Sequence, residues 1–188
     1  MTAGNEFAEL DATLAAVWRE LARGVAETSA PARHPTLATV GDDGAPEART
    51  VVLRAADRDL ARVDVHSDAA SRKTAEIRRV PRVSLHLWHP AARLQLRLRG
   101  TAFVLTGEAV ADIWRTLTAS ARSHYGGTPA PGTPIADPSA HDARVEPARF
   151  AVVRCAVDEI ETLQLGADRH RRARFRADAG WRGTWLAP

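Results

Sequence analysis

The chain has 188 residues, of which 45% are apolar and 26% charged, and its formal net charge is +3. These values are typical of one globular domain with a substantial core, and the spread of basic residues along the chain argues against a nucleic-acid-binding protein. The single cysteine, Cys155, excludes an intramolecular disulfide and a cysteine-cluster metal site, and its apolar neighbours predict a buried, unreactive thiol.

The sequence lacks the patterns of membrane insertion and export. No apolar run approaches the roughly 20 residues that a membrane-spanning helix requires. The first ten residues, MTAGNEFAEL, are acidic and contain no basic stretch followed by an apolar one. We therefore expect a cytoplasmic protein that does not associate with membranes.

The N-terminal region, residues 1–30, contains one predicted helix. Apolar residues recur at helical spacing over residues 6–23, and Gly24 marks the expected end. The periodic residues are Phe7, Leu10, Leu14, Val17, Trp18 and Leu21. This pattern is that of an amphipathic helix with one apolar face.

Strand patterns begin after Pro35. Residues 36–40 predict a strand, the GDDG sequence at 41–44 a hairpin turn, and residues 47–53 the partner strand. Residues 62–66 alternate with period two and predict the next strand.

The middle of the chain combines a short helix with long strands. Residues 71–80 predict the helix, and residues 83–88 and 93–99 predict strands, the second with leucines on one face and polar residues on the other. Gly100 permits a bend or bulge before the strand continues over residues 102–105.

The last third of the chain contains another helix, a loop and further strands. Residues 126–147, rich in Pro, Gly, Ala and Asp, predict a long loop or a mobile flap. Strands are predicted over residues 150–157 and 172–176, and residues 185–188 close the chain. The helix is indicated by Val110, Ile113, Trp114, Leu117 and Ala121. Short turns between strands, with helices inserted rather than alternating, predict a mainly β fold: an antiparallel barrel with peripheral helices, in one domain spanning residues 1–188.

Several common catalytic motifs are absent from the sequence. It contains no GxGxxG or Walker loop and no GxSxG nucleophile elbow. His86 and His89 lie three apart on a predicted strand, so they point to opposite faces and do not chelate a metal together. Metal catalysis is therefore not predicted.

Three cationic segments remain, at residues 49–54 (RTVVLR), 71–73 (SRK) and 169–172 (RHRR). Lys73 is the only lysine in the chain, although a codon bias toward arginine would also explain that. A hydroxyl and two cations at a helix N-terminus suit a phosphate group. Each segment alone is also consistent with a solvated basic surface.

Taken in order, these segments resemble the pyridoxamine 5′-phosphate oxidase family. The similarity includes RTVVLR, then His66-Ser67 ahead of SRK, then RLQLRLRG at residues 93–100. The chain's ending, RHRRARF from residue 169 and WLAP from residue 185, also resembles that family's ending. The similarity extends over residues 34–188, with the proline-rich loop unmatched.

This resemblance implies a Greek-key split β-barrel that forms a homodimer with flavin mononucleotide (FMN) at the subunit interface. It implies that Arg49 binds the phosphate arm or the ribityl oxygens of the flavin, and that Val51 and Val52 line its ring. It further implies that Arg72 and Lys73 hold the phosphate. The other implied cofactor-binding positions are Thr50, Leu53, Arg54, His66, Ser67, Ser71, Gln95, Arg122 and Arg172.

The chemistry of these side chains agrees with the implied roles. A phosphate dianion that leaves water needs several fixed donors, and an arginine fork beside a lysine point charge can grip different oxygens. Gln95 is the sole uncharged polar residue on its strand face. Its amide can donate to a ring carbonyl and accept from a ring N–H, which a guanidinium cannot do.

Departures from the family pattern put vitamin B6 oxidation in doubt. Thr118 stands where pyridoxamine phosphate oxidases carry an arginine for the substrate phosphate, and Trp114 takes the place of a tyrosine. Leu163 stands where the family places a tryptophan against the flavin. The family's Arg-x-His pair is only partly kept, as Arg169-His170. The pattern is similar to a flavin-binding branch of the family whose activity is uncharacterised.

The sequence therefore predicts an FMN-dependent oxidoreductase that acts on an unidentified small substrate. A true pyridoxamine 5′-phosphate oxidase is one alternative, and a flavin- or haem-binding carrier or sensor without turnover is another. A deazaflavin in place of FMN is a further possibility. The sequence names neither the substrate nor the electron acceptor.

Overall fold

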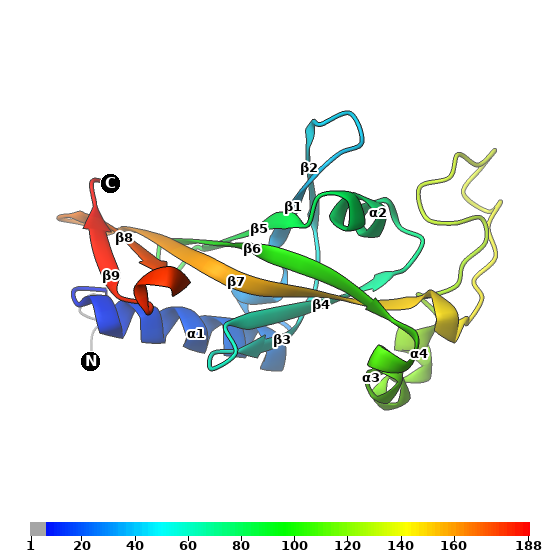
Figure 1. Ribbon diagram of the computed structural model, residues 1–188, viewed down its shortest axis with the longest axis horizontal. Coiled ribbons are helices and arrows are strands. Elements are labelled where there is room, and N and C mark those ends of the chain that lie inside the picture. Colours follow the sequence, from blue (N-terminus) through cyan, green and yellow to red (C-terminus); the bar gives the residue numbers. More distant parts are fainter. Residues whose placement is uncertain (1–6) are drawn as a thin grey trace.

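The structure, a computed structural model, describes residues 7–188. These residues form one antiparallel sheet with helices on its periphery (Figure 1). The strands are β1 (Thr36–Val40), β2 (Pro46–Thr50), β3 (Leu53–Asp57), β4 (Arg62–Asp68), β5 (Arg82–His89), β6 (Leu94–Thr106), β7 (Phe150–Leu165), β8 (His170–Arg176) and β9 (Gly183–Leu186). The helices are α1 (Leu10–Ala26), α2 (Arg72–Arg79), α3 (Ala111–Thr116) and α4 (Ala119–Arg122), with 3₁₀ turns η1 (Pro31–Arg33), η2 (Gly107–Val110), η3 (Pro147–Arg149) and η4 (Ala177–Ala179).

The chain closes this sheet upon itself. The strand order is β2-β1-β5-β6-β7-β4-β3, and β8 and β9 extend it beside β7. β2 and β3 lie at opposite ends of this order, yet only Val51 and Val52 separate them in sequence. That short link joins the two edges, which is how a sheet becomes a barrel. The predicted mainly β fold, an antiparallel split barrel with peripheral helices, is confirmed.

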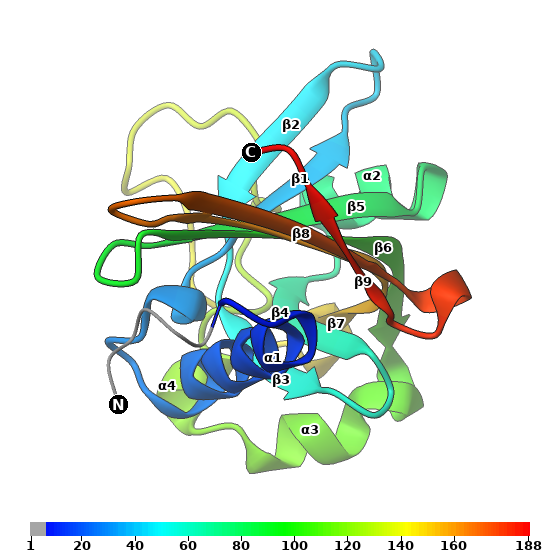
Figure 2. The same ribbon diagram turned by 90° about the vertical axis from the view of Figure 1, so that its left-hand side faces the viewer.

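The barrel interior is filled from one face of each strand. Leu94, Leu96 and Leu98 of β6 are at most 1% exposed, and the alternate residues of the strand point outward, as the alternation predicted. Phe175 of β8 is fully buried in the same cluster. The apolar face of α1 covers this core beside β3 and β9 (Figure 2).

Gly100 marks the predicted irregularity in β6. The register between β6 and β7 shifts between Arg99 and Gly100, so the expected bulge is confirmed. A Cβ atom at Gly100 would lie 2.1 Å from the carbonyl oxygen of Ala156, which is closer than real Cβ contacts come. Only glycine allows the two backbones to approach this closely.

The predicted partner strand over residues 47–53 is confirmed as far as Thr50, where β2 pairs with β1, but its extension to residue 53 is wrong. β2 ends at Thr50 and β3 starts at Leu53, and the backbone N–H of Val51 donates to the carbonyl oxygen of Pro35 at 2.9 Å. A run of β-branched residues has strand propensity throughout, so its composition does not reveal where the chain changes from one edge of the sheet to the other.

The predicted ends of several other elements are also corrected. α1 ends at Ala26, two residues beyond Gly24; a Cβ atom at Gly24 would lie within 2.8 Å of Ala32, so the glycine serves close packing. The predicted helix around residues 110–121 divides into η2, α3 and α4. β7 and β8 are longer than predicted. The predicted helix start at residue 6 lies outside the described residues.

Residues 126–146 contain neither helix nor regular strand, an isolated bridge pairs Thr128 with Asp142, and Pro147 begins η3. Asp68, at the end of β4, accepts hydrogen bonds from the N–H of Gly126, at the start of this segment, at 3.1 Å and from Nε of Arg149, just beyond its end, at 2.9 Å. Within residues 7–188, no helix has the length and apolar character needed to cross a membrane.

Candidate functional site

A hollow of about 320 Å³ lies between β2, the start of α2 and the tip of the 126–147 segment. β2 contributes Glu47, Ala48 and Arg49, and the loop contributes Pro131 and Gly132. Helix α2 and its N-cap contribute Ser71, Arg72, Lys73 and Glu76. We call this site the cationic hollow. It brings together three of the cationic side chains predicted to bind one phosphate.

Local sequence patterns place these side chains. The period of two in β2 sets Glu47 and Arg49 on the same face, and their partners Thr39 and Leu37 in β1 point the same way. Helix α2 buries Thr74 and Ile77 and packs against β1 and β6, and its Glu76 accepts a hydrogen bond from Arg49 of β2. The cations therefore come from two elements that a rigid barrel fixes relative to each other.

Lys73 is the least compensated cation of the cationic hollow. Its ammonium Nζ lies 3.3 Å from the Ser67 hydroxyl, which lies 3.0 Å from the Ser71 hydroxyl. Among residues 7–188, no carboxylate lies within ion-pair distance of Lys73. Burial lowers the pKa of Lys73, and the nearby Arg49 lowers it further. A bound anion would offset both effects.

Arg49 and Arg72 each meet a carboxylate. Arg49 Nη2 donates to Glu76 Oε2 at 2.9 Å, and Arg72 Nη2 lies 3.6 Å from Glu47 Oε1. Three cations and two carboxylates thus line the cationic hollow and leave it with an excess of one positive charge.

The start of α2 adds backbone donors to this charge. The first N–H groups of a helix have no intrahelical acceptor and carry partial positive charge. Ser71, the N-cap residue, makes no side-chain cap hydrogen bond, so its hydroxyl does not occupy those donors. Hydroxyl, ammonium, guanidinium and helix N-terminal donors together fit a phosphate monoester.

Arg54 and His66 belong to a different group. On β4 the side chain of His66 points to the opposite face from the neighbouring Ser67. The His66 ring packs edge-on against Phe150, with centroids 5.0 Å apart, and Phe150 also contacts Trp114 and Tyr125. Burial, and then the charge of Arg54, lower the pKa of His66 to about 4, although Asp64 opposes the shift.

The lowered pKa predicts a pH-dependent stability. Unfolded His66 binds a proton near pH 6.5, but folded His66 does so only near pH 4, so its contribution is present above pH 6.5 and is lost as the pH falls toward 4. Urea unfolding at pH 7.5 and 4.5 should therefore show a smaller loss of stability in His66→Gln than in the natural protein. His124→Gln, at an exposed histidine, is the control. Equal losses in all three proteins would contradict the predicted shift.

Arg122 lies outside the cationic hollow. Its Nε donates to the carbonyl oxygen of Trp114 at 3.2 Å and its Nη2 to that of Arg115 at 2.9 Å. The guanidinium carbon lies 5.3 Å from the Trp114 ring centroid, in cation–π geometry. Thr118 caps α4 by accepting from the Ala121 N–H at 3.2 Å. In this chain, then, Arg122 ties α4 to α3.

Gln95 and Arg172 lie on the outer face of the sheet. Gln95 pairs with Trp88 on β5 and with Leu163 on β7, and Leu163 in turn pairs with Arg172 on β8. Arg172 Nη2 donates to Glu161 Oε1 at 2.8 Å, and Arg97 Nη2 lies 3.1 Å from Glu161 Oε2.

The register separates Gln95 from Arg49. Arg49 pairs with Leu37, which pairs with Leu85, and Leu85 stands three residues before Trp88 on β5. An odd spacing on a strand reverses the face, so Gln95 and Arg49 point to opposite sides of the sheet. In Figure 1, β8 also lies toward one end of the molecule and α2 toward the other. Within a single chain, Gln95 and Arg172 therefore lie away from the cationic hollow.

Residues 51–53 contribute mostly to packing. Val51 is 7% exposed and Leu53 fully buried, and both belong to the main core. Val52 is partly exposed, whereas Thr50 is exposed and alternates with Arg49.

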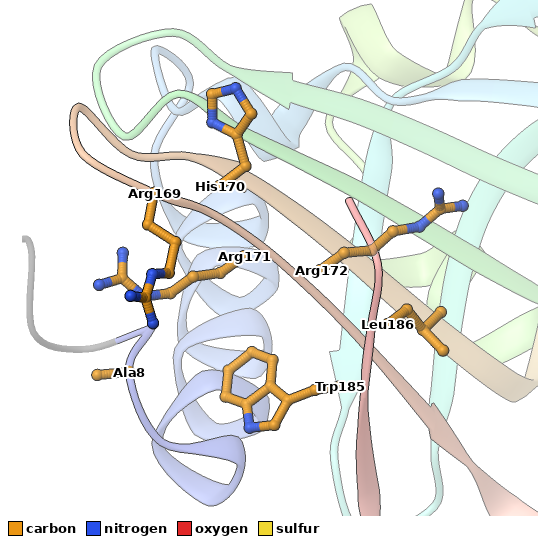
Figure 3. Close-up of a pocket in the computed structure, with 7 residues that line it drawn as sticks. All are labelled: Ala8, Arg169, His170, Arg171, Arg172, Trp185 and Leu186. Carbon is orange, nitrogen blue, oxygen red and sulfur yellow. The ribbon is translucent and has the colours of Figure 1, made fainter.

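A second basic pocket, of about 290 Å³, lies at the β8–β9 end (Figure 3). In this view Arg169 and Arg171 point to the same side, toward Ala8, with Trp185 below them. His170 points the other way. The Arg169-His170 pair therefore does not act as one clamp here.

Sequence reasoning missed the carboxylates of the cationic hollow. Glu76 stands three residues after Lys73 on α2, a spacing that places both on neighbouring parts of one helix surface. Glu47 lies two residues before Arg49, which on a strand gives the same face. Both spacings are visible in the sequence. Only the fold, in which β2 pairs with β1 and α2 packs against β1, shows that the two carboxylates lie in the same site.

Comparison with known proteins agrees with this fold. Residues 15–106 match the family model described as the pyridoxamine 5′-phosphate oxidase, FMN-binding domain. The "Pyridoxine/pyridoxamine 5′-phosphate oxidase 2" of Arabidopsis thaliana is 30% identical over 96 residues, which are 50% of this chain and 48% of that protein. The chain thus aligns with about half the length of this curated relative.

Two solved structures share the fold over nearly the whole chain. A "pyridoxamine 5′-phosphate oxidase-related, FMN binding protein" from Nostoc punctiforme PCC 73102 is 25% identical, with a TM-score of 0.74 over 93% of this chain and 96% of that one. PhzG from Burkholderia lata 383, solved with tetrahydrophenazine-1-carboxylic acid, is 23% identical, with a TM-score of 0.72 over 94% and 92% of the two chains. The second similarity concerns the fold alone.

Proposed function

We propose that this protein is an FMN-dependent oxidoreductase acting on a small molecule, because residues 15–106 match the model of the pyridoxamine 5′-phosphate oxidase FMN-binding domain. The observation that carries the proposal is the cationic hollow, where Arg49, Arg72 and Lys73 line one cavity with a helix N-terminus and an excess positive charge. This donor set fits a phosphate dianion better than it fits a neutral ligand.

The roles of the residues follow from their chemistry. Lys73 and the guanidinium groups of Arg49 and Arg72 would neutralise the FMN phosphate, while the Ser67 and Ser71 hydroxyls would donate to its remaining oxygens. Bound FMN would supply the redox chemistry, and the protein would supply position and electrostatics. Pro131 and Gly132 border the cationic hollow on its loop side and would limit the access of water.

The proposal includes a homodimer that shares its flavins. Gln95 and Arg172 are outer-face residues that cannot meet a flavin held by Arg49 of the same chain. A partner protomer that packs against the outer face of β6 and β7 would present its own cationic hollow to them. Gln95 would then hydrogen-bond the flavin edge of the partner's site. The arrangement accounts for a glutamine amide and an arginine on a sheet face that is otherwise distant from the phosphate.

Pyridoxamine 5′-phosphate oxidation is the second candidate. It is favoured by the identity with the Arabidopsis relative, whose name states that activity. Thr118 argues against it, because this side chain caps α4 and supplies no positive charge for a substrate phosphate. Flavin-loaded protein given pyridoxamine 5′-phosphate should therefore release little peroxide or pyridoxal phosphate, and rapid release of both would establish the second candidate instead.

The identity of the cofactor that the purified protein binds tests the assignment of FMN. Purified protein, incubated with FMN and freed of excess, should show a flavin absorbance spectrum, and extraction followed by mass measurement should return FMN. A haem Soret band or a deazaflavin mass would replace FMN with another cofactor. A colourless protein that retains none of these cofactors would contradict the proposal.

A further inference from the structure

Glu76 is a buried carboxylate in a site that we assign to an anion. It is 2% exposed and lines the cationic hollow. Charged side chains are rarely buried so completely unless they are paired, and a carboxylate beside a phosphate repels it. The position of Glu76 is therefore unfavourable for phosphate binding by charge alone, and its contacts must provide an offsetting advantage.

Those contacts converge on Arg49. Glu76 Oε2 accepts a hydrogen bond from the Thr39 hydroxyl at 2.6 Å and another from Arg49 Nη2 at 2.9 Å. Arg49 Nη1 also donates to the Thr39 hydroxyl oxygen. The three side chains thus form a closed triangle that joins β1, β2 and α2. The guanidinium is held from two sides, while 22% of the Arg49 side chain stays exposed to solvent.

The second carboxylate oxygen of Glu76 has a different environment. Oε1 is buried, and no group within residues 7–188 forms a hydrogen bond with it. A buried acceptor without a partner is unfavourable for the fold.

We propose that Glu76, assisted by Thr39, is a positioning residue that fixes the guanidinium of Arg49 for the FMN phosphate; the inference rests on the proposed function. A free arginine side chain loses rotamer freedom when it binds a ligand, and this loss weakens binding. Pairing with Glu76 removes that freedom before the ligand arrives. The negative charge of Glu76 is the cost of this preorganisation.

The test compares FMN with riboflavin, which has the same ring and ribityl chain but no phosphate. In Glu76→Ala the affinity for FMN should fall about tenfold, because an unrestrained Arg49 must lose its rotamer freedom as the ligand binds. The affinity for riboflavin should stay within about twofold, because Arg49 acts on the phosphate. Glu76→Gln should recover most of the FMN affinity, since its amide oxygen still accepts from Arg49.

Asp112→Ala provides a control of equal charge. It removes one negative charge from the protein, but Asp112 is an exposed residue of α3 that lies outside the lining of the cationic hollow. This variant should bind FMN within about twofold of the natural protein, because an exposed charge at a distance is screened by salt. A weakening equal to that of Glu76→Ala would overturn the positioning role.

The remaining outcomes separate this inference from the proposed function. Equal losses for FMN and riboflavin in Glu76→Ala would assign Glu76 to general folding and overturn the inference. Unchanged FMN affinity in Glu76→Ala would overturn it as well, while leaving the flavin site in place. If the natural protein binds neither flavin, the proposed function fails, and the role of Glu76 fails with it.

Discussion

Replacing Arg49 and Lys73 together by alanine is expected to weaken FMN binding by about 10²- to 10⁴-fold. Each hydrogen bond to a charged group contributes about 1.5–3 kcal/mol, so the loss of two corresponds to about 3–6 kcal/mol. Both side chains line the cationic hollow, and within residues 7–188 Lys73 Nζ donates to the Ser67 hydroxyl and forms no ion pair with a carboxylate. The two substitutions therefore remove hydrogen-bond donors that a bound phosphate would otherwise accept from. Quenching of flavin fluorescence during titration measures the change.

The control for this pair removes the same charge elsewhere. Arg115 and Arg182 are exposed and lie outside the lining of the cationic hollow. Arg115→Ala with Arg182→Ala should leave FMN affinity within about threefold, because exposed charges at a distance are screened by salt. If both double variants weaken FMN equally, net charge rather than a built site governs binding, and the assignment of the cationic hollow is wrong.

Mixed dimers are expected to regain one flavin site from two defective chains. One chain would carry Arg49→Ala with Lys73→Ala, and the other Gln95→Ala with Arg172→Ala. Because these pairs point to opposite faces of the sheet, a site shared between protomers takes its phosphate cluster from one chain and its outer-face residues from the other. The mixed dimer thus contains one intact site and one site with all four changes.

Differently tagged chains, co-expressed and purified through both tags, make this measurement possible. The mixed dimer should bind one FMN per dimer with nearly natural affinity, whereas each homodimer of a defective chain should bind weakly at both sites. If every flavin were held by a single chain, the mixed dimer would contain no intact site. Binding as weak as in the two parent homodimers, or isolation of a monomer only, would contradict the shared site.

The parts of the fold that the sequence predicts well have strong, local signals. The leucines at alternate positions of β6 define both the strand and its buried face, and Gly100 indicates the bulge because a glycine within a strand pattern is typical of one. The SRK segment predicts both the start of α2 and a concentration of positive charge. These features depend on neighbours in the chain, so a single sequence is enough to find them.

Other parts depend on contacts that are distant in sequence. The change from β2 to β3 at Val51 and Val52 is set by which strands occupy the barrel edges, and the composition of the run gives no sign of it. The division of the predicted site residues between two faces follows from the register through β1 and β5. The triangle of Thr39, Arg49 and Glu76 likewise needs three elements to meet.

The proposed FMN site recognises the phosphate, so a flavin with that group and one without it should bind with different affinities. The purified natural protein, freed of bound flavin, would be titrated with FMN and with riboflavin under identical salt and pH. We predict that FMN binds at least about 100-fold more tightly, because three cations and a helix N-terminus act on the phosphate alone. Equal affinities for the two flavins would contradict the account.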